Sequence, residues 1–412
     1  MIIDAKQYAG LCSCGREHQM ATAFSVVEAG CLPKLRDYMQ ANGLNGKTVA
    51  VYDENTYAAC AGKRPVVDEE IILNPEGLHA DEHGVALLQA RLPKDAQILV
   101  AVGSGTIHDI TRYCAYEAHT EFVSCPTAAS VDGFCSSVAA MTWKGCKRTL
   151  TAVAPKLVVA DLEIIKNAPL RLARSGFGDM IGKYVALADW RMAHAITGEF
   201  HCARIADMMA QATRTVQESA PGIAAGEEEA YEKLMYGLLL SGLAMQLMGN
   251  SRPASGAEHH ISHLIEMHPA GIGVQSDALH GEKVGVGTLL ALREYKRLAN
   301  TEPCWQDYAS WQRSELEGPF ADLTEEVLNE NARDVAAGIT AQQLASAWET
   351  VRQILRELPD PAQLEATYNA LGVKATLASI DVDEQKLPLL LRYAPCVRNR
   401  LTLMRLTRCM AS

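Results

Sequence analysis

The chain has 412 residues, of which 48% are hydrophobic and 21% are charged, so it is long enough for two domains with large buried cores. Its formal net charge is −11 and its Lys and Arg residues are scattered, which argues against a nucleic-acid partner. We therefore expect any anionic ligand to be small and to bind in a local pocket.

The N-terminus and the cysteines indicate a cytoplasmic protein. The opening residues MIIDAKQYAGLCSCGREH lack the basic stretch and apolar core of a secretory signal. The most apolar segment, Tyr236 to Gly249, is shorter than the roughly 20 residues that cross a bilayer, so we expect no membrane partner. The 12 cysteines then indicate free thiols in a reducing compartment. Cys12 and Cys14 form an isolated C-x-C, for which we expect a structural or incidental role.

Up to Asp161 the sequence alternates short apolar runs with helical patterns. The runs are rich in Val or Ile, as in strands buried on both faces. The predicted strands are Thr48–Asp53, Glu70–Asn74, Gln97–Gly103, Glu121–Pro126 and Lys156–Asp161. Helical patterns at His83–Leu92 and Ile107–Ala118 lie between them. This alternation predicts a parallel sheet with right-handed crossovers.

After Asp161 the strand signal stops. Apolar residues recur at helical spacing over residues 168–196, 227–249 and 281–299. The sequence therefore predicts an α/β dinucleotide-binding domain over residues 1–163, followed by an all-α domain over residues 164–412. Because small-molecule sites favour clefts between domains, we expect the active site in the interdomain cleft.

A glycine-containing turn follows the predicted strand that ends at Gly103. The segment GSGTIHD, from Gly103 to Asp109, opens a predicted helix, whose N-terminus offers N–H groups to a phosphate. The spacing is not G-x-G-x-x-G, so a plain structural turn is the alternative. Asp53 ends an earlier strand, and PTAAS follows the strand that ends at Pro126. We expect these strand ends to meet at one edge of the sheet, the usual position for a ligand.

Histidines cluster within ten positions of the segment SGAEHHISHLIEMH: His259, His260, His263 and His268. On a helix, His259 and His263 project from one face, whereas His260 lies about 100° round the axis. The pattern is not H-E-x-x-H, which excludes the zinc-protease interpretation.

Two further residues suit a metal site that also includes His259. His280 lies in LHGEKVGVG and Asp179 lies in GFGDMIGKY. One carboxylate and two imidazoles would hold a divalent ion and leave positions open for substrate. A solvated His-rich helix with an unrelated Asp is the alternative.

Together these segments resemble the iron-containing alcohol dehydrogenase and dehydroquinate synthase superfamily, and most closely its sn-glycerol-1-phosphate dehydrogenase family. The matching segments, in the family's order from about residue 50 to about residue 290, are VYDENTY, GSGTIHD, PTAASVDGFCSS, GFGDMIGKY, SRPASGAEHHISH and LHGEKVGVGT. The SRPASG segment with its following EH and SH favours this family over plain glycerol dehydrogenases. No motif after about residue 300 matches.

The resemblance implies a role for individual residues. Asp179, His259 and His280 match the metal-ligand positions, and Asp132 and His263 match catalytic positions that contact substrate. The dinucleotide-contacting positions are matched by Asp53, Gly105, Thr106, Ile107, His108, Asp109, Thr127, Ser130 and Ser136. His260 and His268 receive no role.

The implied function is the reversible, NAD- or NADP-linked reduction of dihydroxyacetone phosphate to sn-glycerol 1-phosphate with one divalent metal ion (Zn, Ni or Fe), in phospholipid metabolism. The alternatives are a glycerol or other polyol dehydrogenase of the superfamily and a non-catalytic nucleotide- or metal-binding relative. We also expect a homo-oligomer, such as a homodimer. The cation for the substrate phosphate stays open among Lys144, Lys147, Arg148, Lys183 and Arg252.

Overall fold

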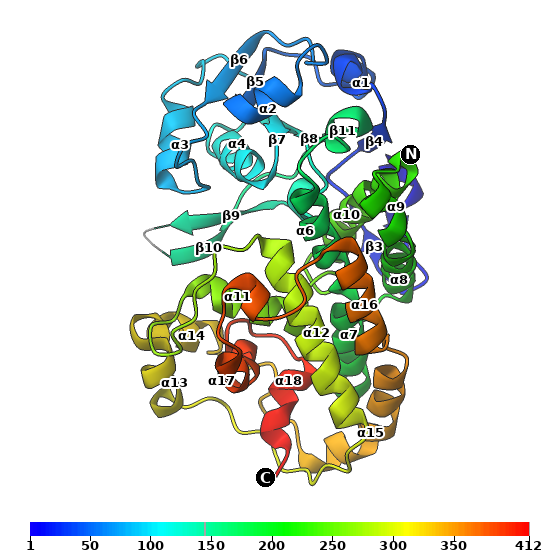
Figure 1. Cartoon of the computed structure of the whole chain (residues 1–412), viewed down its shortest axis with the longest axis vertical. Coiled ribbons are helices and arrows are strands. Elements are labelled where there is room, and N and C mark those ends of the chain that lie inside the picture. The colour runs from blue at the N-terminus through cyan, green and yellow to red at the C-terminus, as the bar shows by residue number, and fades with distance from the viewer. Residues whose placement is uncertain (144–145, 412) are drawn as a thin grey trace. The chain divides into compact units, whose positions relative to one another are not determined.

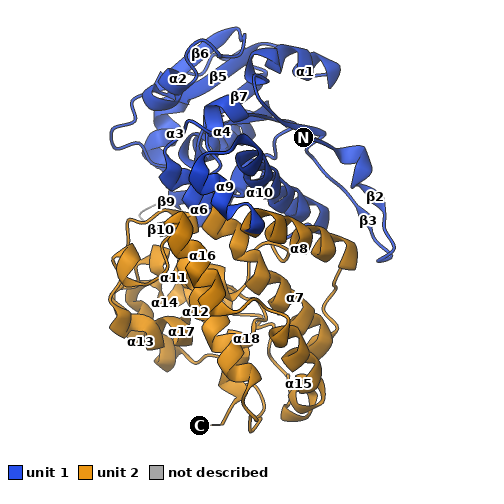
Figure 2. Ribbon diagram, turned by 45° about the vertical axis from the view of Figure 1, so that its right-hand side comes forward, with its two compact units in different colours: residues 1–176, 218–250 blue, residues 177–217, 251–412 orange. Residues whose placement is uncertain are grey.

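The computed structural model describes residues 1–143 and 146–411, and the chain divides into two compact units (Figure 2). This division differs from the expected boundary between residues 163 and 164, because a later helical segment is part of the first unit. Unit 1 comprises Met1–Gly176 and Glu218–Asn250, and unit 2 comprises Phe177–Gln217 and Ser251–Ser412.

A seven-stranded sheet forms the centre of unit 1, with strand order β1-β4-β11-β8-β7-β5-β6 (Figure 1). Every neighbouring pair is parallel except β1 with β4. The strands are β1 (Ile2–Asp4), β4 (Phe24–Glu28), β5 (Thr48–Asp53), β6 (Glu69–Leu73), β7 (Ile98–Gly103), β8 (Glu121–Pro126) and β11 (Leu157–Asp161). The predicted parallel sheet is confirmed, and all five predicted strands form within one residue of their expected bounds.

The strands alternate their side chains between two hydrophobic cores, as the period of two requires. Tyr52 and Val100 contribute to one core, whereas Val51, Leu99 and Ala101 contribute to the other. The helices of unit 1 that precede α6 are α1 (Leu35–Ala41), α2 (Glu54–Ala59), α3 (Glu82–Gln89), α4 (Gly105–Glu117) and α5 (Leu162–Ile165). Both predicted helical patterns of this region are confirmed as α3 and α4.

Two hairpins and three further helical segments complete unit 1. The hairpins pair β2 (Gly10–Leu11) with β3 (Glu17–His18), and β9 (Val138–Trp143) with β10 (Cys146–Thr151). The helical segments are α9 (Ala220–Ala225), α10 (Glu228–Met248) and the first part of α6 (Leu170–Ile181). Helix α10 packs against β4, α5 and the short 3-10 helix η3 (Gly133–Cys135), which explains why it belongs to unit 1.

Unit 2 is helical, as predicted for the C-terminal part, and no named strand occurs among the residues described after Asp161. Its helices, besides the end of α6, are α7 (Lys183–Thr197), α8 (Ala203–Glu218), α11 (Ala257–Met267), α12 (His280–Ala299), α13 (Arg313–Phe320), α14 (Thr324–Glu330), α15 (Ala341–Arg356), α16 (Pro361–Leu371), α17 (Leu387–Tyr393) and α18 (Leu403–Leu406). Among the helices described, none combines the length and apolar character that crossing a bilayer requires.

Candidate metal and dinucleotide sites

A carboxylate and two imidazoles converge in unit 2. Asp179 lies near the end of α6, His259 lies in the first turn of α11, and His280 is the first residue of α12. One ligand atom of each residue lies within 4.8 Å of the others, and His259 Nε2 is 3.5 Å from Asp179 Oδ1. Asp179 and His259 are buried, whereas the His280 side chain is 31% exposed, which leaves an approach for substrate. This donor set fits a Zn, Ni or Fe ion with open positions.

Glycines allow the three helices that carry these residues to approach one another closely. A Cβ on Gly178 would lie 2.3 Å from the carbonyl oxygen of Gly281, and a Cβ on Gly287 would lie 2.6 Å from that of Glu258. At Gly182, which separates α6 from α7, a Cβ would lie 2.9 Å from Val284 Cγ1. Gly178, Gly182 and Gly287 are therefore required by helix packing.

A buried carboxylate fixes the start of α11. Asp189 on α7 accepts a hydrogen bond from the backbone N–H of Ala257 at 2.9 Å. It also accepts from the Tyr295 hydroxyl at 2.7 Å and from the backbone N–H of Leu403 at 3.0 Å. Asp189 thereby joins α7, α12 and α18 to the helix turn that presents His259.

A neighbouring carboxylate orients the ring of His259. Glu258 Oε1 accepts from His259 Nδ1 at 2.6 Å and from the backbone N–H of Gly256 at 2.8 Å. Nδ1 therefore carries a hydrogen, and Nε2 faces Asp179, as in metal-binding histidines. Burial alone lowers the pKa of His259, but its hydrogen bonds to Asp179 and Glu258 prevail and raise that pKa to about 9. The site therefore attracts positive charge between Asp179 and His259.

Asp179 is ionised despite its burial. Burial alone would raise its pKa, but the nearby Lys183 ammonium and the two imidazoles hold the pKa well below its usual range. Lys183 Nζ lies 2.8 Å from Asp179 Oδ1, and both side chains are fully buried. Lys183, one of the cations considered for the substrate phosphate, is thus paired with the Asp179 carboxylate.

Sequence reasoning missed Glu266, which contacts two histidines. Its Oε1 accepts from His280 Nδ1 at 2.9 Å and forms an ion pair with Lys283 Nζ at 3.2 Å, and its Oε2 accepts from His263 Nδ1 at 3.2 Å. Burial would raise the Glu266 pKa, but these basic partners hold it well below its usual range. The signal was available, because Glu266 follows His263 by three residues and therefore lies on the same helix face.

Two overlapping sets of residues have the spacing of a metal site. Besides Asp179, His259 and His280, the set His263, Glu266 and His280 also meets the distance criterion. We favour the first set because its three residues match the metal-ligand positions that the family resemblance implies. In that arrangement Glu266 directs the Nε2 atoms of His263 and His280 toward other partners.

The other two histidines of the cluster are structural. His260 is fully buried, and neither of its ring nitrogens has a hydrogen-bond partner among the described residues. His268 ends α11 in the left-handed conformation, with φ of 51°. Because most of α11 is buried, the alternative interpretation of a solvated His-rich helix is wrong.

In unit 1, the two glycines of the turn after β7 have different roles. A Cβ on Gly103 would lie 2.6 Å from Ile107 Cβ, so this glycine allows α4 to pack on the strand. A Cβ on Gly105 would meet only Val131 Cγ2, at 4.0 Å, so the first residue of α4 faces open space. Ser104 makes no capping hydrogen bond with its side chain, which leaves the leading N–H groups of the helix to an anion.

The expected dinucleotide-contacting residues of α4 differ in what they can offer. Ile107 belongs to the hydrophobic core, and His108 Nε2 lies 2.8 Å from Ser124 Oγ. Burial lowers the pKa of His108 to about 3. Only the backbone of these two residues is therefore suited to a ligand, whereas the Thr106 side chain is exposed and Asp109 lies 3.4 Å from Arg112.

Arg112, which sequence reasoning missed, organises the segment after β8. This buried guanidinium donates to the carbonyl oxygens of Gly133 at 2.8 Å, Phe134 at 3.0 Å and Val138 at 3.0 Å. The segment carries the two predicted site residues Asp132 and Ser136.

The predicted residues after β8 form hydrogen bonds both within their own segment and to other elements of unit 1. Asp132 Oδ2 accepts from the Ser241 hydroxyl at 2.7 Å, and the Ser136 hydroxyl donates to the carbonyl oxygen of Val138 at 2.8 Å. The backbone N–H of Thr127 donates to the carbonyl oxygen of Gly103 at 3.0 Å. Ser130 Oγ lies 3.1 Å from Ser104 Oγ. The strand end after β8 is therefore joined to the turn after β7.

Asp53 lies at the same sheet edge. It ends β5, which neighbours β7, and the carboxyl ends of parallel strands share one edge. Asp53 Oδ1 also caps α2 by accepting from the backbone N–H of Thr56 at 2.8 Å. The structure thus brings Asp53, the turn at Gly105 and Thr127 to one edge of unit 1, whereas Asp132 and His263 belong to different units. The interdomain cleft stays a prediction.

Most of the cations considered for the substrate phosphate either have other partners or are outside the residues that the structure describes. Lys144 is outside the described residues. Arg252 makes two hydrogen bonds to the Glu199 carboxylate, at 2.6 and 2.5 Å. Arg148 is exposed on β10. The described contacts single out no phosphate-binding cation.

The chain is similar to known dehydrogenases. Residues 26–169 match the iron-containing alcohol dehydrogenase family. The chain is 32% identical to glycerol-1-phosphate dehydrogenase (NAD(P)+) of Bacillus licheniformis, over 98% of this chain and 93% of the relative. It is 39% identical to the protein of the same name from Halalkalibacterium halodurans, over 73% of this chain and 77% of the relative. The fold is similar to that of sulfoacetaldehyde reductase from Bifidobacterium kashiwanohense in complex with NAD+, with a TM-score of 0.60 at 16% identity over 95% of this chain and 96% of the other. The chain therefore belongs to the iron-containing alcohol dehydrogenase superfamily and, within it, to the glycerol-1-phosphate dehydrogenase family.

Proposed function

We propose that this protein is a metal-dependent, NAD(P)H-linked dehydrogenase that reversibly reduces dihydroxyacetone phosphate to sn-glycerol 1-phosphate. This proposal is supported chiefly by the convergence of Asp179, His259 and His280. The chain that contains them is 32% identical, over 98% of its length, to a glycerol-1-phosphate dehydrogenase. An exposed ring edge at His280 beside two buried ligands suits a site that binds both an ion and a small substrate.

In this proposal Asp179, His259 and His280 hold one divalent ion, either Zn, Ni or Fe. When bound, the ion supplies a Lewis acid for the substrate carbonyl. Lys183 keeps Asp179 ionised, and Glu258 and Glu266 hold the two rings by their Nδ1 atoms. Hydrogen bonds and ion pairs to residues outside the ligand set therefore hold the proposed ligands in position before the ion binds.

His263 and Asp132 are the proposed substrate contacts. The pKa of His263 is lowered to about 4 by burial, which outweighs its hydrogen bond to Glu266. The ring is therefore neutral near pH 7, with Nδ1 donating to Glu266 and Nε2 able to accept from a substrate hydroxyl. Asp132, held by the Ser241 hydroxyl, is the second proposed group for orienting hydroxyls or relaying a proton.

The dinucleotide is proposed to bind at the sheet edge of unit 1. The N–H groups that open α4 would receive the pyrophosphate, next to Thr127 and Ser130. Asp53 would accept hydrogen bonds from a ribose and would repel a 2′-phosphate, which favours NADH over NADPH. Asp53→Asn keeps an oxygen for the cap of α2, so a change in cofactor preference in this variant reports the charge alone.

A substrate screen tests the proposal. The metal-reconstituted protein is assayed with dihydroxyacetone phosphate, dihydroxyacetone and glycerol, each with the matching form of NAD and NADP. We expect turnover of dihydroxyacetone phosphate to exceed that of dihydroxyacetone. Turnover of glycerol and dihydroxyacetone without the phosphorylated substrate would instead identify a polyol dehydrogenase. Absence of all turnover in metal-loaded protein would favour a non-catalytic relative.

A further inference from the structure

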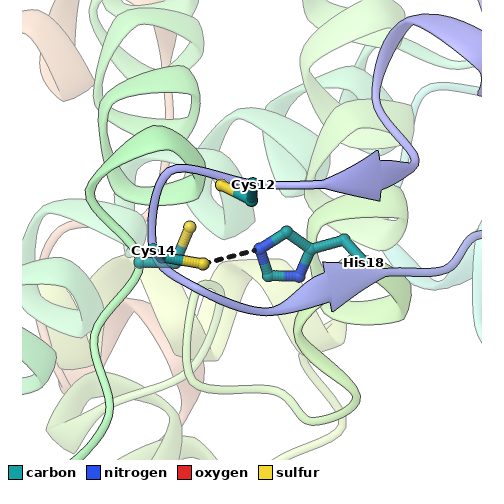
Figure 3. Close-up of side chains that lie close together, drawn as sticks. Cys12, Cys14 and His18 are labelled. Atoms are coloured by element: carbon teal, nitrogen blue, oxygen red, sulfur yellow. Dashed lines mark hydrogen bonds between the residues drawn. The ribbon is translucent and has the colours of Figure 1, made fainter.

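A second group of side chains with the spacing of metal ligands lies in the N-terminal hairpin of unit 1 (Figure 3). Cys12 and Cys14 lie in the turn between β2 and β3, and His18 ends β3. One ligand atom from each lies within 4.8 Å of the others, and Cys14 Sγ is 3.3 Å from His18 Nε2. A tetrahedral zinc ion, with bonds of about 2.3 Å to sulfur and 2.0 Å to nitrogen, separates such donors by roughly 3.5 to 3.8 Å. The hairpin therefore presents its donors close to the required spacing.

The backbone of the segment CSCGREH explains why the three side chains converge. The N–H of Gly15 donates to the carbonyl oxygen of Cys12, and the N–H of Cys12 donates to that of Arg16, each at 3.0 Å. Gly15 adopts a left-handed conformation, with φ of 84°, which reverses the chain directly after Cys14. This tight turn places both sulfurs near the ring of His18 (Figure 3).

The ring of His18 is oriented as a metal ligand. Nδ1 lies 2.7 Å from the carbonyl oxygen of Leu247, in the last turn of α10. A carbonyl oxygen only accepts, so Nδ1 carries the hydrogen, and in the neutral ring the lone pair lies on Nε2, beside Cys14 Sγ. Metal-binding histidines commonly donate their other N–H to a backbone carbonyl in this way.

The two paired strands of the hairpin contribute little stability by themselves. Each strand has two residues, and Leu11, the apolar side chain of β2, is 85% exposed. An isolated pair of short strands is marginally stable in water. Nevertheless Cys12 and His18 are buried, at 6% and 4% exposure. A metal ion bound by these residues would cross-link the turn of the hairpin to the end of β3 and stabilise it.

We propose that Cys12, Cys14 and His18 bind a structural zinc ion, distinct from the ion of the catalytic site. Thiolate ligands select zinc over metals that prefer oxygen, whereas the catalytic set contains no thiolate. Binding releases the thiol protons, and the fourth tetrahedral position is filled by water or by a donor elsewhere in the chain. No electron transfer is involved.

Cobalt substitution of the full-length protein tests this site. Thiolate bound to Co(II) gives a near-ultraviolet charge-transfer band that carboxylate and imidazole ligands do not give. We expect this band in the parent and in His280→Ala, and we expect its loss in Cys14→Ser. Cys304→Ser, which alters an exposed thiol, is the matched control and should retain the band.

Metal analysis and proteolysis supply readouts that do not depend on activity. The zinc-loaded parent should contain two ions per chain, and Cys14→Ser should lose one of them. Trypsin should cleave after the exposed Arg16 faster in Cys14→Ser than in Cys304→Ser, with the rest of the circular dichroism spectrum unchanged. A cobalt-loaded parent without the charge-transfer band, or equal metal content in Cys14→Ser and the parent, would overturn the proposal.

Discussion

At the scale of single residues, the sequence indicated the atoms that could bind a metal but not the groups that hold them. Asp179, His259 and His280 were predicted from residue type and family resemblance, and the structure brings them together. Glu258 and Lys183 contact His259 and Asp179 over short sequence separations, whereas the hydrogen bond of Glu266 to His280 joins α11 to α12 and depends on how these helices pack. Residue spacing does not report a contact between two helices such as that of Glu266 with His280.

Glu266→Gln should weaken both the metal site and catalysis. The glutamine amide has one acceptor oxygen, so the Nδ1–H of His280 or that of His263 loses its acceptor. Loss of such an outer contact typically lowers metal affinity or activity by about 10- to 100-fold. Metal titration and steady-state kinetics measure both quantities, with the exposed Glu302→Gln as the control. Parent values for both would mean that Glu266 does not position these rings.

His263→Ala should retain the metal but lose much of the catalytic efficiency. Removal of a hydrogen bond that strengthens in the transition state costs about 2 to 4 kcal/mol, or roughly a 10²- to 10³-fold loss of rate. Metal analysis and steady-state kinetics on one preparation measure the metal content and the catalytic efficiency of this variant. A metal-free His263→Ala would instead identify His263, Glu266 and His280 as the ligand set.

Substitutions of His260 test whether this histidine has a structural role. The direction of His260 on the helix gives it no role at the metal site, but its full burial predicts that the cavity left in His260→Ala lowers stability. His260→Leu fills the space and removes two partnerless nitrogens, so it should keep or raise the melting temperature. Equal melting temperatures for the parent and the Ala variant, measured by calorimetry, would contradict this interpretation.

At the scale of helices and strands, the elements with the most continuous apolar runs were predicted most accurately. β5 and β8 formed within the predicted bounds because their runs are continuous and buried. β4 was missed because Ser25 interrupts its apolar run, and β9, whose first four residues alternate between exposed and buried, was missed as well. Residues 168–196 were predicted as helical, but the break at Gly182 follows from close packing rather than periodicity.

A substitution in the turn between β7 and α4 tests whether this turn binds the dinucleotide. Gly105→Val should sharply raise the Michaelis constant for the dinucleotide, because a branched side chain would fill the space in front of the opening N–H groups. The fold should tolerate it, since only Val131 lies within 4.0 Å of the new Cβ. Kinetics with varied cofactor and a thermal melt separate the two effects. Unchanged cofactor affinity would make the turn a structural feature only.

At the scale of the whole molecule, the sequence predicted the classes of structure but not the division of the chain. The α/β and helical parts are confirmed, yet α10 belongs to the unit that contains the sheet. Periodicity identifies a helix without stating which core receives it, and α10 is apolar around most of its circumference. The long segment after about residue 300, which carries no recognised motif, completes unit 2 as a series of helices.

The central claim is that one divalent ion at Asp179, His259 and His280 supports reduction of dihydroxyacetone phosphate. The most direct measurement combines metal analysis with turnover of this substrate in the parent and in His280→Ala. We predict that the variant loses turnover and binds the catalytic ion more weakly, while its circular dichroism spectrum matches that of the parent, because three protein ligands become two. Full turnover with a full complement of metal in His280→Ala would show that His280 is not a ligand of the catalytic ion.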